Sequence, residues 1–322
     1  MINNINYQKN NPHKVMQLLI DGQIKTIDAL NMLCEIEKCN NTSLKSEDDG
    51  QLEDVMKELD ELVGQIKVKQ LVRELQAFVE IQKKREEEQL LTEPQVLHMI
   101  FKGNPGTGKT TVARLLGKMF KHMNILQKGH TIEVERADMV GEYIGHTAQK
   151  TREQIKRALG GILFIDEAYS LARGGEKDFG KEAIDTLVKA MEDHKDNLIV
   201  ILAGYKDEME RFLQVNPGLR SRFPIIMDFN DYTINELIQI AELMVKNREY
   251  KFLPSTLDKL EKILINHHNG KYYDKMGNAR LVRNIIEKAI RMQAVRLINE
   301  KTISREDLIY LKPEDISYIN IE

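Results

Sequence analysis

A glycine-rich segment carries the clearest chemical signal in the sequence. It reads Gly103-Asn104-Pro105-Gly106-Thr107-Gly108-Lys109-Thr110 and fits the pattern G-x-x-x-x-G-K-[ST] at every fixed position. Glycines let the backbone curl so that its N–H groups point at a phosphate. Lys109 would neutralise the β- and γ-phosphates, the Thr110 hydroxyl would ligate Mg²⁺, and Thr111 follows in the same turn. A chance glycine-rich turn would lack the lysine and the threonine, so the segment predicts binding of ATP or GTP.

Two carboxylates end a later apolar run and supply the second part of a reaction. The run Ile162-Leu163-Phe164-Ile165 leads directly into Asp166 and Glu167. Consecutive apolar residues are typical of a central parallel strand, whose carboxyl end is where such sheets bind ligands. Asp166 would hold Mg²⁺, and Glu167 would orient and polarise the attacking water. The alternative is a strand that merely ends in solvated acids, but together with the glycine-rich segment the pair favours hydrolysis.

The elements that would position these residues alternate between strands and helices. Short strand-like runs are expected to form strands at 96–101, 131–134, 162–165, 198–203 and 225–229, with helical patterns between them. This order predicts an α/β fold with a parallel sheet covered by helices on both faces. After Asn230 we expect no more strands, and helices at 234–245, 256–265 and 278–299 predict a small all-helical domain. The expected domains are an N-terminal extension with a linker (1–50), a nucleotide-binding domain (51–230) and a helical domain with a tail (231–322).

Composition excludes several classes of protein. Apolar residues make up 42% and charged residues 30% of the 322 residues, which is typical of a globular chain. The net charge of -3 is weak evidence against a protein built to coat nucleic acid. No apolar run approaches the ~20 residues that a membrane helix needs. Cys34 and Cys39 make no disulfide framework, and no signal pattern begins the chain. We therefore expect a cytoplasmic protein.

With both motifs in place, the sequence from about Leu59 to Asp307 resembles the AAA+ ATPases, and closely the CbbX/CfxQ branch. The resemblance implies a phosphate-loop fold with a helical lid, ATP and Mg²⁺ as cofactors, and a homo-oligomeric ring, in the family a hexamer. It places Val63 and Gly64 beside the adenine base. It also places a pore loop at Tyr143, Ile144 and Gly145, where an aromatic ring grips an extended polypeptide. On the residues alone, Tyr143 could instead pack into the core.

Three more segments acquire roles from the same resemblance. Tyr205 follows the fourth strand, at the position where many members carry a short polar side chain that positions water; this sequence has a tyrosine there instead. Asn216-Pro217-Gly218-Leu219-Arg220-Ser221-Arg222 is similar to the segment that sends an arginine into a neighbouring subunit's site. Spacing does not decide between Arg220 and Arg222, and either could pair with an acid instead. Arg280, at the start of a lid helix, is similar to the arginine that reports nucleotide to the lid.

Three functions are compatible with these residues. The first is a ring-forming ATPase that remodels a protein through its pore, which the triplet Tyr143-Ile144-Gly145 favours. The second is a ring motor on nucleic acid of the helicase or clamp-loader type, and the third is a nucleotide switch, which Glu167 argues against. Within the branch, the sequence looks like members from endospore-forming bacilli, which implies a role in sporulation. The sequence does not identify a substrate.

Overall fold

The computed structural model describes residues 15–16, 19–20, 29, 50–92, 96–143, 145–173, 179–268, 277–298, 300 and 302–317. The chain divides into two compact units, Met1–Met56 and Lys57–Glu322. In the first unit, residues 50–56 are helical. The second unit begins with helical residues 57–61 and contains the sheet, the lid helices and all the predicted chemistry described below. Residues 1–49 lie mostly outside the described residues, as does Ile144 of the predicted pore loop.

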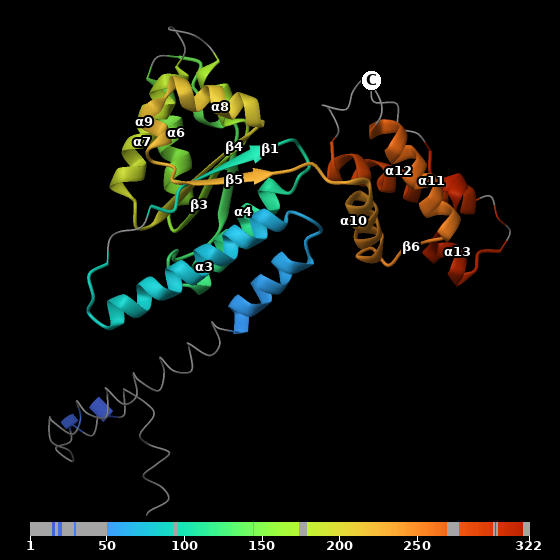
Figure 1. Cartoon of the computed structure of the whole chain (residues 1–322), viewed down its shortest axis with the longest axis horizontal. Coiled ribbons are helices and arrows are strands. Elements are labelled where there is room, and N and C mark those ends of the chain that lie inside the picture. The colour runs from blue at the N-terminus through green and yellow to red at the C-terminus, as the bar shows by residue number, and fades with distance from the viewer. Residues whose placement is uncertain are drawn as a thin grey trace, which may run out of the picture. The chain divides into compact units, whose positions relative to one another are not determined.

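A parallel sheet forms the centre of the nucleotide-binding part (Figure 1). Among the described residues its strand order is β2-β3-β4-β1-β5, with neighbours paired in parallel throughout. The strands are β1 (Met99–Gly103), β2 (Thr131–Val134), β3 (Gly161–Ile165), β4 (Leu198–Gly204) and β5 (Ile225–Phe229). Every residue of β3 and β4 is buried, which explains why both read as continuous apolar runs.

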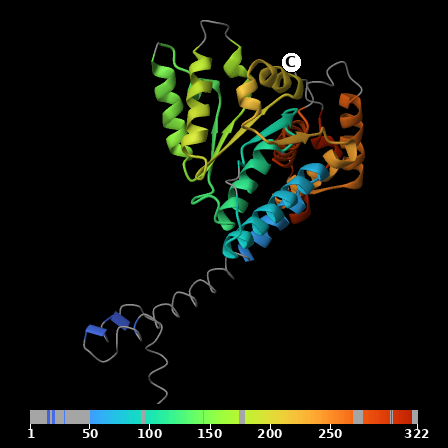
Figure 2. The same ribbon diagram turned by 60° about the vertical axis from the view of Figure 1, so that its left-hand side comes forward.

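Helices cover both faces of this sheet (Figures 1 and 2). Alternate strand residues point to opposite faces: Ile100, Leu163 and Val200 belong to the core under α6, α7 and α8. On the other face, Phe101 packs against Phe164 at 6.3 Å between ring centroids. The helices of this part are α3 (Ile66–Glu87), α4 (Lys109–His122), α5 (Arg136–Met139), α6 (His146–Ala158), α7 (Gly180–Asp193), α8 (Lys206–Val215) and α9 (Pro217–Arg220), with a 3₁₀ helix, η2 (Ala168–Ala172).

The lid has its own apolar core. It consists of α10 (Ile234–Lys246), α11 (Pro254–His268), α12 (Ala279–Leu297), α13 (Arg305–Ile309) and η5 (Pro313–Asp315). The Thr233 hydroxyl caps α10 and the Glu236 carboxylate completes the capping box, which explains why the helix begins there. The helical character of the lid is confirmed. The expectation of no strands after Asn230 is wrong in one detail, because β6 (Lys251–Phe252) and β7 (Tyr310–Leu311) pair in parallel.

That small pair is invisible to sequence patterns because two residues define no period. It forms because the segment after α13 returns to α11 and α12. Buried Gln293 on α12 donates to the carbonyls of Asp307 and Tyr310, and the Thr256 hydroxyl on α11 donates to the Leu311 carbonyl at 2.8 Å. Satisfying these buried carbonyls fixes the returning segment as an extended strand.

Candidate functional site

The glycine-rich segment lies between β1 and α4 and turns over the N-terminus of that helix. Gly106 and Gly108 have φ of +74° and +98°, where glycine is free of the strain that a side chain would bring. Gly108 caps α4, which starts at Lys109. The first N–H groups of a helix have no partner within it and attract anions. The sequence therefore folds here into the phosphate-binding turn that it predicts.

Lys109 is the buried cation of this turn. Its ammonium donates to the carbonyls of Gly103 and Asn104, each at 2.8 Å. Burial lowers the pKa of Lys109, although the Asp166 carboxylate acts in the opposite direction. Nearby Arg280 lowers the pKa further, so several charges meet at this point. An ammonium held by two carbonyls keeps one N–H for a phosphate oxygen.

A cavity of about 380 Å³ opens beside the turn and collects most of the predicted residues. Both Asp166 and Glu167 line it from the end of β3. Glu167 has φ 46°, the left-handed region that few side chains adopt, and its N–H donates to the Asp166 carboxylate at 2.9 Å. The predicted residues on the cavity wall are Gly103, Pro105, Gly106, Gly108, Lys109, Thr110, Thr111, Asp166, Glu167, Tyr205 and Arg280.

Two tyrosines stand at the ends of β3 and β4. Tyr205 lines the cavity, and its ring centroid lies 6.2 Å from that of Tyr169 on η2. Burial and the neighbouring Glu167 raise the pKa of Tyr169 to about 12, and the Arg173 guanidinium sits over its ring at 4.7 Å. Sequence reasoning missed Tyr169. The only available signal was its position two residues after Glu167, which does not indicate that η2 turns the ring back toward Tyr205.

The lid supplies the remaining wall. Arg280 and Arg283, in the first turns of α12, both line the cavity. Arg283 was not predicted, although its spacing of three residues from Arg280 places it on the same helix face. Arg114 on α4 also lines the cavity and pairs with Glu133 at 2.5 Å. A phosphate in this cavity would therefore meet Lys109 and up to three guanidinium groups, which is strong electrostatic complementarity.

Comparison with known proteins agrees with this geometry. Residues 99–231 match the model of the ATPase family associated with various cellular activities (AAA), and residues 233–321 match the AAA lid domain. The chain belongs to the AAA ATPase family. It is 56% identical over 268 residues to stage V sporulation protein K of Bacillus subtilis, covering 83% of each chain. It is 43% identical to protein CbbX of Cereibacter sphaeroides, covering 82% of this chain and 85% of that relative.

The chain is also similar to a chloroplastic relative and to a solved structure. A chloroplastic ribulose bisphosphate carboxylase/oxygenase activase of Cyanidioschyzon merolae is 42% identical over 83% of this chain and 91% of that relative. The structure of the FIGL-1 AAA domain with ADP aligns with a TM-score of 0.53 at 17% identity, over 79% of this chain and 80% of that one, and supports the fold alone. The prediction of an AAA+ ATPase of the CbbX/CfxQ type is confirmed. As an AAA ATPase the protein binds and hydrolyses ATP.

Four of the predicted nucleotide contacts do not line this cavity in the AAA ATPase. Val63 packs against the lid core, and a side chain at Gly64 would collide with Glu236 of α10. The Thr107 hydroxyl donates to the Asn104 carbonyl at 2.8 Å, and the Asn104 amide donates to Asp231. Asn104 and Thr107 therefore use their side chains to shape the turn. The base contact at Val63 and Gly64 stays a prediction.

The donor set at the cavity suits magnesium. Thr110 and Asp166 line the same wall and offer a hydroxyl and a carboxylate. Mg²⁺ is a hard cation that prefers oxygen, binds few protein groups and keeps phosphate and water as its other ligands. Within the described residues, no group of three or more His, Cys, Asp or Glu side chains could hold a metal ion by itself. Two protein oxygens beside a phosphate-binding turn thus fit Mg²⁺ bound together with a nucleotide.

The two candidate arginines of the AAA ATPase differ in their surroundings. Arg222 pairs with Glu192 of α7 and donates to the Gly218 carbonyl at 2.8 Å. Arg220, at the end of α9, is exposed, and no acid pairs with it among the described residues. The structure brings neither arginine into its own subunit's cavity. The alternative of an intrachain ion pair therefore holds for Arg222 only.

Tyr143 is 67% exposed, so it does not pack into the core. Its ring lies edge-on to His146 at 5.6 Å between centroids, at the N-terminus of α6. Gly145 has φ +84° and caps α6, and a side chain there would meet no atom within 4 Å. The Tyr143 side chain is thus open to solvent, and there is open space around Gly145. No described helix is long and apolar enough to cross a membrane.

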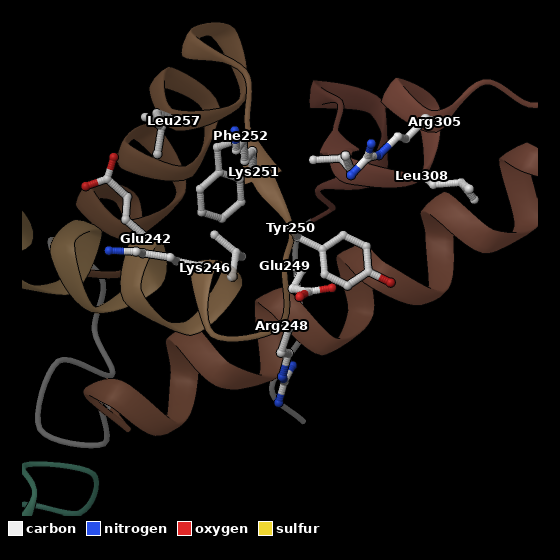
Figure 3. A pocket seen from close by; sticks show the side chains of 12 residues that line it. Glu242, Lys246, Arg248, Glu249, Tyr250, Lys251, Phe252, Leu257, Arg305 and Leu308 are labelled. Carbon is white, nitrogen blue, oxygen red and sulfur yellow. The ribbon is translucent and has the colours of Figure 1, made fainter.

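A second cavity, of about 920 Å³, lies within the lid (Figure 3). It is lined by the end of α10, β6 and α13, with Tyr250, Phe252 and Leu257 among its side chains. Although larger than the cavity beside the phosphate-binding turn, it combines no glycine turn with paired carboxylates. The chemistry of the AAA ATPase therefore belongs to the smaller cavity.

Proposed function

We propose that this chain forms a homo-oligomeric ring, as a hexamer, that couples Mg²⁺-dependent ATP hydrolysis to remodelling of a protein substrate in the cytoplasm. The exposed Tyr143, close in sequence to Gly145 with open space around it, carries the proposal. An exposed aromatic ring packs on any side chain or backbone, while glycine lets the turn swing. The name of the algal relative refers to activation of an enzyme, which supports a protein as the substrate class. The Bacillus subtilis relative's name supports a role in sporulation.

The residues of the cavity divide the reaction among them. Lys109 and the first turn of α4 bind and orient the β- and γ-phosphates, and Arg280 joins them from the lid. Mg²⁺, held by Thr110 and Asp166, would neutralise charge on the phosphate oxygens. Glu167 accepts a proton from the attacking water at its carboxylate. Arg220 or Arg222 reaches the γ-phosphate of the neighbouring subunit.

Substitutions of Tyr143 distinguish substrate binding at this residue from ATP hydrolysis in the cavity. Tyr143→Ala should assemble and keep basal ATPase activity, because Tyr143 does not line the nucleotide cavity. It should lose the stimulation of ATPase activity that an unfolded, tailed protein substrate gives to the parent. Tyr143→Phe should retain most of that stimulation, since grip needs the aromatic face and not the hydroxyl. Melting temperature should stay unchanged in both variants, because a largely exposed side chain contributes little to stability.

Two outcomes would contradict the proposal. Stimulation of the parent by single-stranded DNA and not by protein would assign the ring motor to nucleic acid. A Tyr143→Ala protein that melts early and loses basal activity would return Tyr143 to a structural role. The control variant is His194→Ala. This residue is exposed and lies at the end of α7, remote in sequence from Tyr143. Tyr250 is not used as a control because it lines the lid cavity.

A further inference from the structure

A carboxylate on the segment between sheet and lid joins the phosphate-binding turn to the lid helix α12. Asp231 follows β5 and precedes the Thr233 cap of α10. The Asn104 amide donates to both oxygens of Asp231, at 3.1 and 2.9 Å. The Asn278 amide, from the residue that precedes α12, donates to the same carboxylate at 2.8 Å. One charged group thus accepts hydrogen bonds from both sides.

Asn278 is tied to the turn by more than this carboxylate. Its side-chain amide also donates to the Pro105 carbonyl at 3.3 Å, and its side-chain oxygen accepts from the Tyr232 N–H at 3.0 Å. The next residue, Ala279, donates its N–H to the Gly106 carbonyl at 3.1 Å. A Cβ at Gly106 would collide with the Gly277 carbonyl oxygen, so the two backbones are in direct contact.

The backbone of Asn278 has a conformation that its surroundings must hold in place. Its φ of 43° and ψ of -124° lie in a region that side chains rarely adopt, and the residue is 2% exposed. Such conformations are strained and persist where surrounding contacts determine them. The hydrogen bonds of Asn278 to Asp231, Pro105 and Tyr232 are contacts of this kind. The start of α12, the helix that brings Arg283 to the cavity, is therefore fixed by the turn itself.

We infer that Asp231 is a positioning residue that couples the phosphate-binding turn to α12 through Asn104 and Asn278. A phosphate that orders residues 104–106 would order the first turn of α12 through these bonds, and would thereby set Arg280 and Arg283. The coupling is reciprocal, so displacement of α12 would weaken phosphate binding at the turn. The inference rests on the proposed function only in taking the phosphate of ATP as the ligand.

The chain allows a donor–acceptor swap as a test. Asp231→Asn keeps the shape but places an amide N–H against the amide of Asn104 or Asn278, so that two donors face each other. Asn104→Asp alone places two carboxylates together. In the double variant that combines both changes, the amide introduced at position 231 would donate to the carboxylate introduced at position 104 and accept from Asn278. The pairing is thereby restored without a change in net charge. Asp228→Asn, on β5 and exposed, is the matched control.

The primary readout is hydrogen exchange of backbone amides in residues 279–283, with and without a non-hydrolysable ATP analogue. In the parent and in Asp228→Asn, the analogue should increase protection of these amides, starting with Ala279. Asp231→Asn should lose most of that increase and bind the analogue about tenfold more weakly, as expected for a lost charged hydrogen bond. The double variant should recover at least half of both effects. Asn104→Ala removes only the hydrogen bonds from the phosphate-binding turn to Asp231, and it should also lose the increase in protection. This variant provides the test if Asp231→Asn does not fold stably.

Parent-like protection in Asp231→Asn or in Asn104→Ala would overturn the inference. So would a double variant that is no better than the two single variants, because a structural defect would not be repaired by a swap. These readouts require neither hydrolysis nor a protein substrate. A parent that binds the analogue and shows the protection but remodels nothing would refute the proposed function and leave the coupling intact.

Discussion

At the scale of single residues, the cavity separates binding from hydrolysis. Lys109 holds the turn and offers an N–H to phosphate, so Lys109→Ala should abolish ATP binding. Glu167→Gln keeps the shape of the wall and leaves Asp166 in place but removes the charge that takes a proton from water. We expect Glu167→Gln to bind ATP with near-parent affinity and to hydrolyse it at least a hundredfold more slowly, within the ~10²–10⁴ that general-base catalysis contributes.

Equilibrium binding of labelled ATP together with single-turnover hydrolysis measures both quantities. Glu153→Gln, an exposed acid on α6 away from the cavity, should match the parent in both. Parent-rate hydrolysis by Glu167→Gln would show that another group activates the water. Tyr169, whose ring contacts Tyr205 beside the cavity, would then be the next residue to test.

The residues that were predicted share one property: their types and spacing are local in the chain. Lys109 and Thr110 lie in one motif, and Asp166 and Glu167 end one strand. Two of the residues that were missed, Asp231 and Tyr169, reach the site through the fold. Asp231 is 127 residues from Asn104, and no local pattern connects them. Arg283 had a local signal in its spacing from Arg280, whereas Tyr169 depends on how η2 turns.

At the scale of elements, the strands were predicted well because each is a short apolar or alternating run between polar turns. β2 and β5 have the predicted bounds, and β3 and β4 extend by one residue. β1 begins later than expected, at Met99, because the residues just before it do not join the sheet as a strand. Val96 is 45% exposed, and His98 turns its ring into the core. A hydrophobicity pattern counts histidine as polar, so it cannot predict that this side chain is buried.

His98 joins several of these elements as a neutral side chain. Its Nδ1 accepts from the Val200 N–H of β4 at 3.1 Å, its ring also hydrogen-bonds the Met191 carbonyl of α7, and it packs against Phe223 at 5.9 Å. Burial lowers the pKa of His98 to about 4. The unfolded chain gains a proton near pH 6.5, and the folded chain gains it only near pH 4. The neutral histidine therefore contributes stability fully above pH 6.5, and this contribution is lost as the pH falls to 4.

The expected loss is about 3 kcal/mol between pH 6.5 and pH 4, from the pKa lowered to about 4. Urea unfolding across this range should therefore show a steeper decline for the parent than for His98→Gln, which has no group that titrates there. His194→Gln, an exposed histidine at the end of α7, should follow the parent. Equal slopes for the parent and His98→Gln would mean that carboxylates alone cause the acid sensitivity.

At the scale of the whole molecule, the cavity contains no arginine from the α9 region, although the proposed reaction needs one at the γ-phosphate. Neither Arg220 nor Arg222 lines the cavity of its own subunit, so in the proposed ring this arginine would come from a neighbour. A head-to-tail interface of this kind makes each site composite. Specific ATPase activity should therefore rise with protein concentration as rings assemble.

Mixed rings test the composite site and distinguish the two arginines. Lys109→Ala subunits bind no nucleotide but keep both arginines, whereas a subunit that lacks the essential arginine keeps its nucleotide site. Each should be inactive alone, since such an arginine contributes ~10³–10⁵ in rate, and mixing should restore activity at roughly one interface in four.

Arg220→Ala and Arg222→Ala are each mixed with Lys109→Ala, and Arg211→Ala on α8 is the control that should stay active alone. The arginine whose loss is rescued by mixing is the one that acts between subunits. Activity that is independent of concentration, or variants that stay inactive in every mixture, would refute the composite site.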